Sequence, residues 1–130
     1  MTVKRAVLKG LPLPQFTQVF VRIDYRGSVY RTQNMTNKDR PNEPEWETTI
    51  TFDVFELTES LQISVFYSQS ENFHLFGSCK IRLSTWCRPE PYFQAAELEK
   101  GAGVVHMKAV FERFAVESDD EDTLVKPNNA

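Results

Sequence analysis

Hydrophobic and polar residues alternate with a period of two along most of this 130-residue chain. Between residues 19 and 26 the odd positions are apolar and the even positions are mostly polar, which is the pattern of a strand with one buried face. The same alternation predicts further strands over residues 3–9, 29–33, 46–53, 61–67, 78–83, 93–98 and 105–112. No window of a dozen residues shows a helical stripe. The chain is therefore predicted to be all-β, with about eight strands.

The segments between these strands are rich in Gly, Pro, Asn and Ser. Gly27-Ser28 predicts a tight hairpin turn, and residues 68–74 are predicted to form a loop. Short strands at this spacing favour a sandwich of two antiparallel sheets. From residue 117 the composition changes to ESDDEDTLVKPNNA. We therefore predict a domain over residues 1–116 and an acidic disordered tail or linker over residues 117–130.

Composition and charge narrow the classes of function. The formal net charge is −3, which argues against wrapping nucleic acid on a broad cationic face. No run approaches the roughly 20 apolar residues that cross a bilayer, and the first residues lack a secretory signal pattern. Cys79 falls on an inward strand position, so reduced cysteines are favoured over a Cys79–Cys87 disulfide. These features predict a cytoplasmic protein.

The chain lacks the usual signatures of an enzyme. Its two histidines, His74 and His106, stand at no recognisable spacing from a nucleophile, and the five glycines form no phosphate-binding loop. No Cys/His pattern has the spacing of a zinc site. The sequence therefore predicts a non-catalytic protein without a cofactor.

Several motifs occur in the order found in C2 domains, and residues 3–114 resemble that family. The most specific motif is residues 42–52, NEPEWETTITF, which is close to the family's Asn-Pro-x-Trp-x-Glu-x-x-x-Phe with one residue inserted. The other matching segments are Leu11-Pro12, Val19–Ile23, Tyr30–Thr32, Leu61–Phe66, Phe76-Gly77 and Ile81–Leu83. The resemblance implies an eight-stranded antiparallel β-sandwich and leaves open which of the family's two circular permutations applies.

The resemblance also implies where calcium would bind if this member bound it. Calcium-binding C2 domains use several aspartates from loops at one end of the sandwich, and hard cations need such clustered oxygens. The matching positions are Gln18, Tyr67 and Gln69, and Glu71 is the one carboxylate in the third loop. We therefore predict that this chain does not bind calcium.

Two groups of residues are candidates for contact with a partner. Leu13 and Phe16 in the first loop, with Phe73 and Leu75 in the third, form apolar tips that could meet a protein or a membrane. The alternative is that they plug the core.

Arg22, Arg26 and Arg31 are expected to face outward on a hairpin, where they could contact anionic lipid. Glu47 and Asp53 are expected to share or adjoin that face and to neutralise part of its charge. Ser118 lies in an acidic context typical of casein-kinase-type phosphorylation.

These observations predict a calcium-independent targeting or scaffolding module that binds a protein partner through its loop tips. Direct binding of anionic or phosphoinositide membranes is the alternative. Either function places the protein in the cytoplasm, peripheral at a membrane or a cytoskeletal structure.

Overall fold

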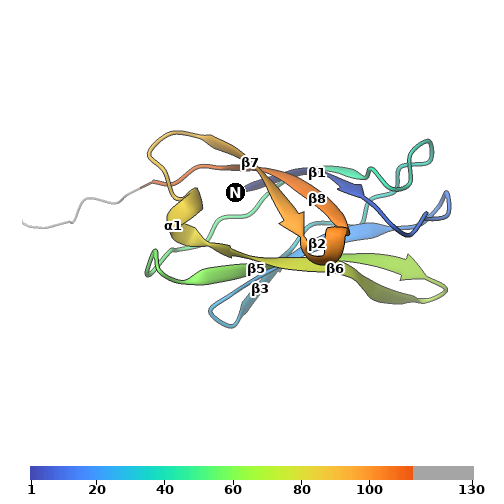
Figure 1. The fold of residues 1–130 in the computed structure, drawn as a ribbon, viewed down its shortest axis with the longest axis horizontal. Coiled ribbons are helices and arrows are strands. Elements are labelled where there is room, and N and C mark those ends of the chain that lie inside the picture. Colours follow the sequence, from blue (N-terminus) through green and yellow to red (C-terminus); the bar gives the residue numbers. More distant parts are fainter. Residues whose placement is uncertain (113–130) are drawn as a thin grey trace, which may run out of the picture.

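The computed structural model describes residues 1–112, which form two stacked antiparallel sheets (Figure 1). The first sheet has the strand order β4-β1-β8-β7, and the second has the order β3-β2-β5-β6. The strands are β1 (Thr2–Leu8), β2 (Val19–Tyr25), β3 (Ser28–Arg31), β4 (Glu45–Thr49), β5 (Ser60–Gln69), β6 (Asn72–Arg82), β7 (Tyr92–Leu98) and β8 (Gly103–Ala109). The predicted all-β, eight-stranded sandwich is confirmed within these residues. Two short helical turns, α1 (Leu83–Trp86) and η1 (Glu99–Gly101), complete the fold.

The core lies between the sheets and is built from the inward positions of the alternating pattern. Val21 and Ile23 of β2 meet Ile63 of β5, and Val105 and Met107 of β8 face them from the other sheet; all five are almost fully buried. Each such side chain contributes roughly 1.5–3 kcal/mol relative to leaving it exposed. The period-two reading therefore identified the buried face of these strands correctly.

β4 is shorter than predicted. The sequence pattern runs from residue 46 to 53, but the ladder ends at Thr49. Ile50 is nevertheless buried, and its amide donates to the carbonyl of Met1 at 2.7 Å. Alternating burial therefore continues for a few residues after regular pairing has stopped.

The segment predicted as a loop over residues 68–74 is instead the end of a long hairpin. β5 and β6 stay paired up to Gln69 opposite Asn72, and Ser70 and Glu71 form the two-residue turn. Ser70 has a φ of 61°, a left-handed conformation in which Gly or Asn is the usual residue. The turn therefore carries no glycine signal in the sequence, and the loop prediction is wrong.

A β-bulge explains why the apolar residues in the first half of β6 face outward, although they keep the phase of the inward Cys79 in the sequence. Val65 pairs with Gly77 whereas Phe66 pairs with Leu75, so Phe76 is the extra residue. An extra residue reverses the faces of the side chains beyond it. A period-two reading of the sequence consequently assigns Phe73 and Leu75 to the wrong face of β6.

Three connections lie together at one end of the sandwich: the first loop (residues 9–18), the β3–β4 connection (residues 32–44) and the β5–β6 turn (Figure 1). We call this the loop end. α1 lies at the opposite end, near the point where the described chain stops (Figure 1). Neither helical turn has the length or apolar character to cross a bilayer. The predicted boundary at residue 116, the tail 117–130 and Ser118 lie outside the described residues.

Candidate functional site

Asn42 fixes the shape of the first loop. Its side-chain oxygen accepts a hydrogen bond from the amide of Leu13 at 2.8 Å, and its side-chain nitrogen donates to the carbonyls of Leu8 and Leu11 at 3.1 and 2.9 Å. Asn42 belongs to the motif over residues 42–52, so this motif connects β4 to the loop end. One side chain thereby determines which residues of the first loop turn inward.

The structure corrects the prediction that Leu13 is an exposed tip. Leu13 is only 7% exposed and packs in the core, because the bond to Asn42 draws its backbone inward. Phe16, the other apolar residue predicted as a tip of this loop, is 68% exposed. Of these two residues, Phe16 is therefore an exposed tip and Leu13 is a core residue.

Four exposed apolar side chains occur at the loop end. Leu11 is 47% exposed, and Phe73 and Leu75 on β6 are 39% and 56% exposed. With Phe16 they form what we call the loop-tip surface, and Leu11 is a member that the sequence analysis named only as part of a matching segment. Exposed apolar groups of this kind mark contact surfaces.

The positions that correspond to calcium ligands do not form a cation site. The backbone amide of Gln18 donates to the hydroxyl of Ser68 at 2.8 Å, and the backbone amide of Ser68 donates to the backbone carbonyl of Gln18 at 2.9 Å. Residues 1–112 contain no group of three or more His, Cys, Asp or Glu side chains that could hold a metal ion. The residues present therefore do not fit Ca²⁺, which needs several clustered oxygen ligands.

An aromatic cluster lies on the outer face of the second sheet, next to the loop-tip surface. The rings of Phe20 and Phe66 stack with centroids 5.1 Å apart, and Phe73 meets Phe20 edge-on at 5.1 Å. The guanidinium groups of Arg31 and Arg22 cover Phe20 and Phe66, at 3.7 and 5.0 Å from the ring centroids. The signal for this cluster in the sequence was Phe20, an aromatic residue on the predicted outward face of β2.

The three arginines of the predicted basic face do not lie together. Arg22 and Arg31 are opposite each other on β2 and β3, but Arg26 lies at the hairpin turn, where it pairs with Glu59. Arg22 is itself paired with Asp24 at 3.1 Å.

Glu47 does not share that face. It lies on β4 in the other sheet and pairs with Lys4 at 3.1 Å. The prediction that Glu47 neutralises the basic face is therefore wrong, and Asp24 is the carboxylate that reduces its charge.

Charge is unevenly distributed along the chain. Residues 1–112 hold 13 of the 15 Lys and Arg side chains and 13 of the 18 Asp and Glu side chains, so the net charge of −3 belongs entirely to residues 113–130. At the loop end the ammonium of Lys38 lies 5.8 Å from the ring centroid of Phe16. Lys9 and Lys100 line a cavity beside Leu11 and Leu75. The apolar tips are thus accompanied by cations.

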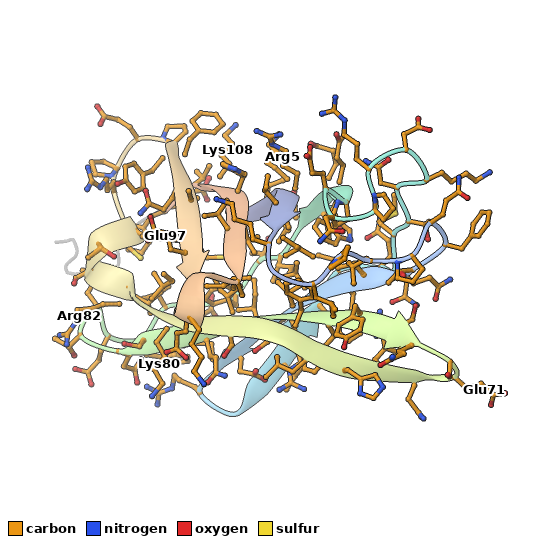
Figure 2. The ribbon with its side chains drawn as sticks, turned by 45° about the vertical axis from the view of Figure 1, so that its right-hand side comes forward. Arg5, Glu71, Lys80, Arg82, Glu97 and Lys108 are labelled. Atoms are coloured by element: carbon orange, nitrogen blue, oxygen red, sulfur yellow. The ribbon has the colours of Figure 1, made fainter. Side chains whose placement is uncertain are left out.

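Carboxylates also occur at the loop end. Asp39 and Glu43 lie on the β3–β4 connection, where Glu43 pairs with Arg40. Glu71 occupies the turn of the β5–β6 hairpin and projects from its extreme end (Figure 2). A carboxylate at this point opposes insertion of the turn itself into an apolar or anionic phase. Contact through this hairpin must therefore use the flank that carries Phe73 and Leu75.

Burial affects several titratable groups away from the loop end. Burial raises the pKa of the Cys79 thiol to about 11, so this thiol is protonated and unreactive near neutral pH. Burial and the nearby Arg5 lower the pKa of His106, which keeps that imidazole neutral. His74 packs its ring against Tyr67 with centroids 5.8 Å apart. Cys79 and Cys87 are free thiols.

A model of the C2 domain family matches residues 2–98. The chain belongs to the C2 domain family. C2 domains are generally non-catalytic targeting and binding modules. The match covers the sandwich up to the end of β7, and β8 completes the first sheet beyond it.

Solved structures show the same fold. The first C2 domain, domain A, of plant extended synaptotagmin 1 superimposes with a TM-score of 0.73 at 22% sequence identity, covering 88% of this chain and 92% of that one. A structure of the two C2 domains, A and B, of extended synaptotagmin 2 gives a TM-score of 0.60 at 20% identity, covering 82% of this chain and 36% of that one.

CC2D1B, described as acting in the mitotic reformation of the nuclear envelope, gives a TM-score of 0.63 at 11% identity, covering 84% of this chain and 52% of that one. At these identities the likeness concerns the fold. No curated protein sequence matches this chain.

Proposed function

We propose that this C2 domain is a non-catalytic, calcium-independent module that attaches to anionic membrane surfaces through the loop-tip surface. The observation that carries the proposal is the group of four exposed apolar side chains at one end of the sandwich, accompanied by Lys9, Lys38 and Lys100. Apolar groups enter the boundary of the acyl chains while cations stay among the headgroups. The location that follows is peripheral, at a membrane facing the cytoplasm.

The energies are sufficient for reversible attachment. Burying an exposed apolar side chain contributes roughly 25 cal/mol per Å² of surface removed from water. Each basic residue near an anionic leaflet adds about 1 kcal/mol. Because residues 1–112 carry equal numbers of acidic and basic side chains, the domain as a whole is not repelled by that leaflet. The net charge of −3 of the whole chain therefore does not argue against contact between this domain and an anionic membrane.

Calcium independence follows from the ligand positions. Hydrogen bonds between Gln18 and Ser68 join the two segments that would hold the metal. Residues 1–112 contain no cluster of carboxylates that could take the place of the missing ligands. Apolar tips without a metal make attachment constitutive, so that lipid composition rather than calcium controls it.

Vesicle flotation tests the proposal. Vesicles of phosphatidylcholine alone, and with added phosphatidylserine or phosphoinositide, are mixed with the full chain in excess EGTA and again with calcium. We expect binding to anionic vesicles that calcium does not change. The double variant Phe16→Ser with Leu75→Ser is expected to lose at least tenfold in affinity.

Phe93→Ser is the matched control. Phe93 lies on β7 and is 68% exposed, as is Phe16, so removing it alters the same amount of apolar surface as Phe16→Ser does, but away from the loop end. Equal losses in the control and the double variant would contradict the proposal, as would binding that requires calcium.

A protein partner is the second candidate, and the aromatic cluster favours it. Phe20, Phe66 and Phe73 with Arg22 and Arg31 form a rigid patch of the residue types that dominate protein contact sites. In that case Phe66→Ser removes binding of an isolated partner while Phe16→Ser leaves it unchanged. Retained flotation of Phe66→Ser, which lies outside the loop-tip surface, alongside that loss would separate the two surfaces.

A further inference from the structure

A cavity of about 220 Å³ opens beside the loop-tip surface. Three segments enclose it: Lys9 and Gly10 after β1, Lys100 and Gly101 before β8, and the region of β6 around Leu75 and Phe76. The volume equals roughly seven water molecules at about 30 Å³ each, which is below the 300–1,000 Å³ typical of sites for drug-sized ligands. The cavity therefore suits a small chemical group.

Close backbone contacts hold the frame of this cavity. The amide of Lys9 donates to the carbonyl of Ala102 at 2.8 Å. A Cβ atom on Gly103 would lie 2.1 Å from the carbonyl oxygen of Val7, and one on Gly77 would lie 2.9 Å from the Cβ of Ala102. These glycines allow β1, β6 and the β7–β8 turn to approach one another, so the walls of the cavity are preformed.

The turn places a lysine at a position of backbone strain. Lys100 has a φ of 60° and the next residue, Gly101, a φ of 69°. Gly or Asn adopts this left-handed conformation at less cost than Lys does. Strain of this kind concentrates at functional sites. Lys100 therefore stands at a position where Gly or Asn would be more favourable for the backbone conformation.

The two lysines give the cavity a positive character. Within residues 1–112 neither Lys9 nor Lys100 makes an ion pair. Glu99 precedes Lys100 in the same turn and does not line the cavity. The apolar walls lower the local dielectric and strengthen attraction for an anion.

We propose that this cavity binds a phosphomonoester, with the phosphate between Lys9 and Lys100 and a short apolar group against Leu75 and Phe76. Lysine binds phosphate as a point charge with three donors, and two such charges match a dianion. The walls of Leu11, Leu75 and Phe76 favour an ester over inorganic phosphate, because they remove its organic part from water. This site goes beyond the loop-tip surface, since Phe16 and Phe73 do not line it.

An NMR titration of the full chain with phenyl phosphate tests the site without a membrane. We expect saturable shifts of the Gly10 and Gly101 amides, and an affinity about tenfold lower in Lys9→Gln and in Lys100→Gln. Lys80→Gln is the control, because Lys80 lies on β6 away from the loop end (Figure 2). The absence of saturable shifts overturns the proposal, and so does an equal affinity in all three variants.

A second variant separates ligand binding from a structural role of Lys100. Lys100→Asn relieves the left-handed strain, so its melting temperature is expected to rise by about 3 °C while the affinity for phenyl phosphate falls about tenfold. Unchanged affinity in this variant contradicts the proposed role of Lys100.

The source of the phosphomonoester is determined with vesicles of equal charge density. Phosphatidic acid carries a phosphomonoester headgroup and phosphatidylserine does not. A preference for phosphatidic acid that Lys9→Gln and Lys100→Gln abolish identifies a lipid source. Lysine-dependent binding of phenyl phosphate without that preference identifies a soluble ligand. We expect Phe16→Ser to leave the phenyl phosphate titration unchanged. The proposals for the cavity and for the loop-tip surface are therefore tested separately.

Discussion

At the scale of single residues, Asn42 decides which side chains of the first loop are exposed. Its three hydrogen bonds hold the backbone of residues 8–13 and turn Leu13 into the core. We predict that Asn42→Ala lowers the free energy of unfolding by about 2 kcal/mol, because a net 0.5–1.5 kcal/mol is lost for each bond. Urea unfolding measures the change. Asn34→Ala, on the exposed β3–β4 connection, is the control and is expected to cost less than about 0.5 kcal/mol; equal costs would contradict this role of Asn42.

Glu59 gives a pH dependence at the same scale. The hydroxyl of Tyr25 donates to one carboxylate oxygen at 2.6 Å, and this bond, followed by the charge of Arg26, lowers the pKa of Glu59 below its usual 4.5. A carboxyl group with a lowered folded-state pKa contributes stability above the unfolded-state value and loses it as the pH falls through the folded-state value. Glu59→Gln should therefore flatten the decline of the melting temperature below about pH 4.5. Coincident profiles for the wild type and Glu59→Gln would refute the assignment.

The residue scale also shows where sequence reasoning ends. The inward positions of β2, such as Val21 and Ile23, follow from alternation alone and are confirmed. Leu13 and Phe16 lie in a loop without a period, and their orientation depends on Asn42, which is distant in the sequence. Hydrophobicity identified both residues as candidates but could not tell which one is buried.

At the scale of elements, the contact between β6 and the β7–β8 turn depends on Gly77. A Cβ there would lie 2.9 Å from the Cβ of Ala102. We predict that Gly77→Ala costs about 1–3 kcal/mol of stability. Ala102→Gly removes the opposing atom, so the double variant should recover much of this loss in a double-mutant cycle. Additive changes in stability in that cycle would contradict a steric clash between the side chains at positions 77 and 102.

The same elements show why the extent of the hairpin escaped prediction. Alternation describes β5 as far as residue 67, but the bulge beside Phe66 changes the faces of β6 and the turn uses Ser70 rather than Gly. Both features depend on pairing across the sheet, which a single strand's pattern does not contain. The eight strands and the sandwich could be predicted, and the length of this hairpin could not.

At the scale of the whole molecule, the position of charges matters more than their sum. The excess negative charge lies in residues 113–130, and Glu71 is the carboxylate that projects from the tip of the β5–β6 turn (Figure 2). If the loop end approaches an anionic leaflet, Glu71→Gln should tighten vesicle binding about fivefold, since one charge near the surface is worth about 1 kcal/mol. Glu97→Gln on β7 is the control, and its affinity should not change. Equal gains in both variants would point to a general charge effect.

The most direct test of the loop-tip surface as a membrane contact is the fluorescence of Phe16→Trp. The native Trp46 and Trp86 are each 2% exposed, so a tryptophan at position 16 is the one placed to respond to lipid within residues 1–112. In excess EGTA we predict a blue shift of its emission with anionic vesicles, and quenching by lipids brominated near the headgroup. Emission that stays unchanged as anionic vesicles are added, with or without calcium, would contradict the account.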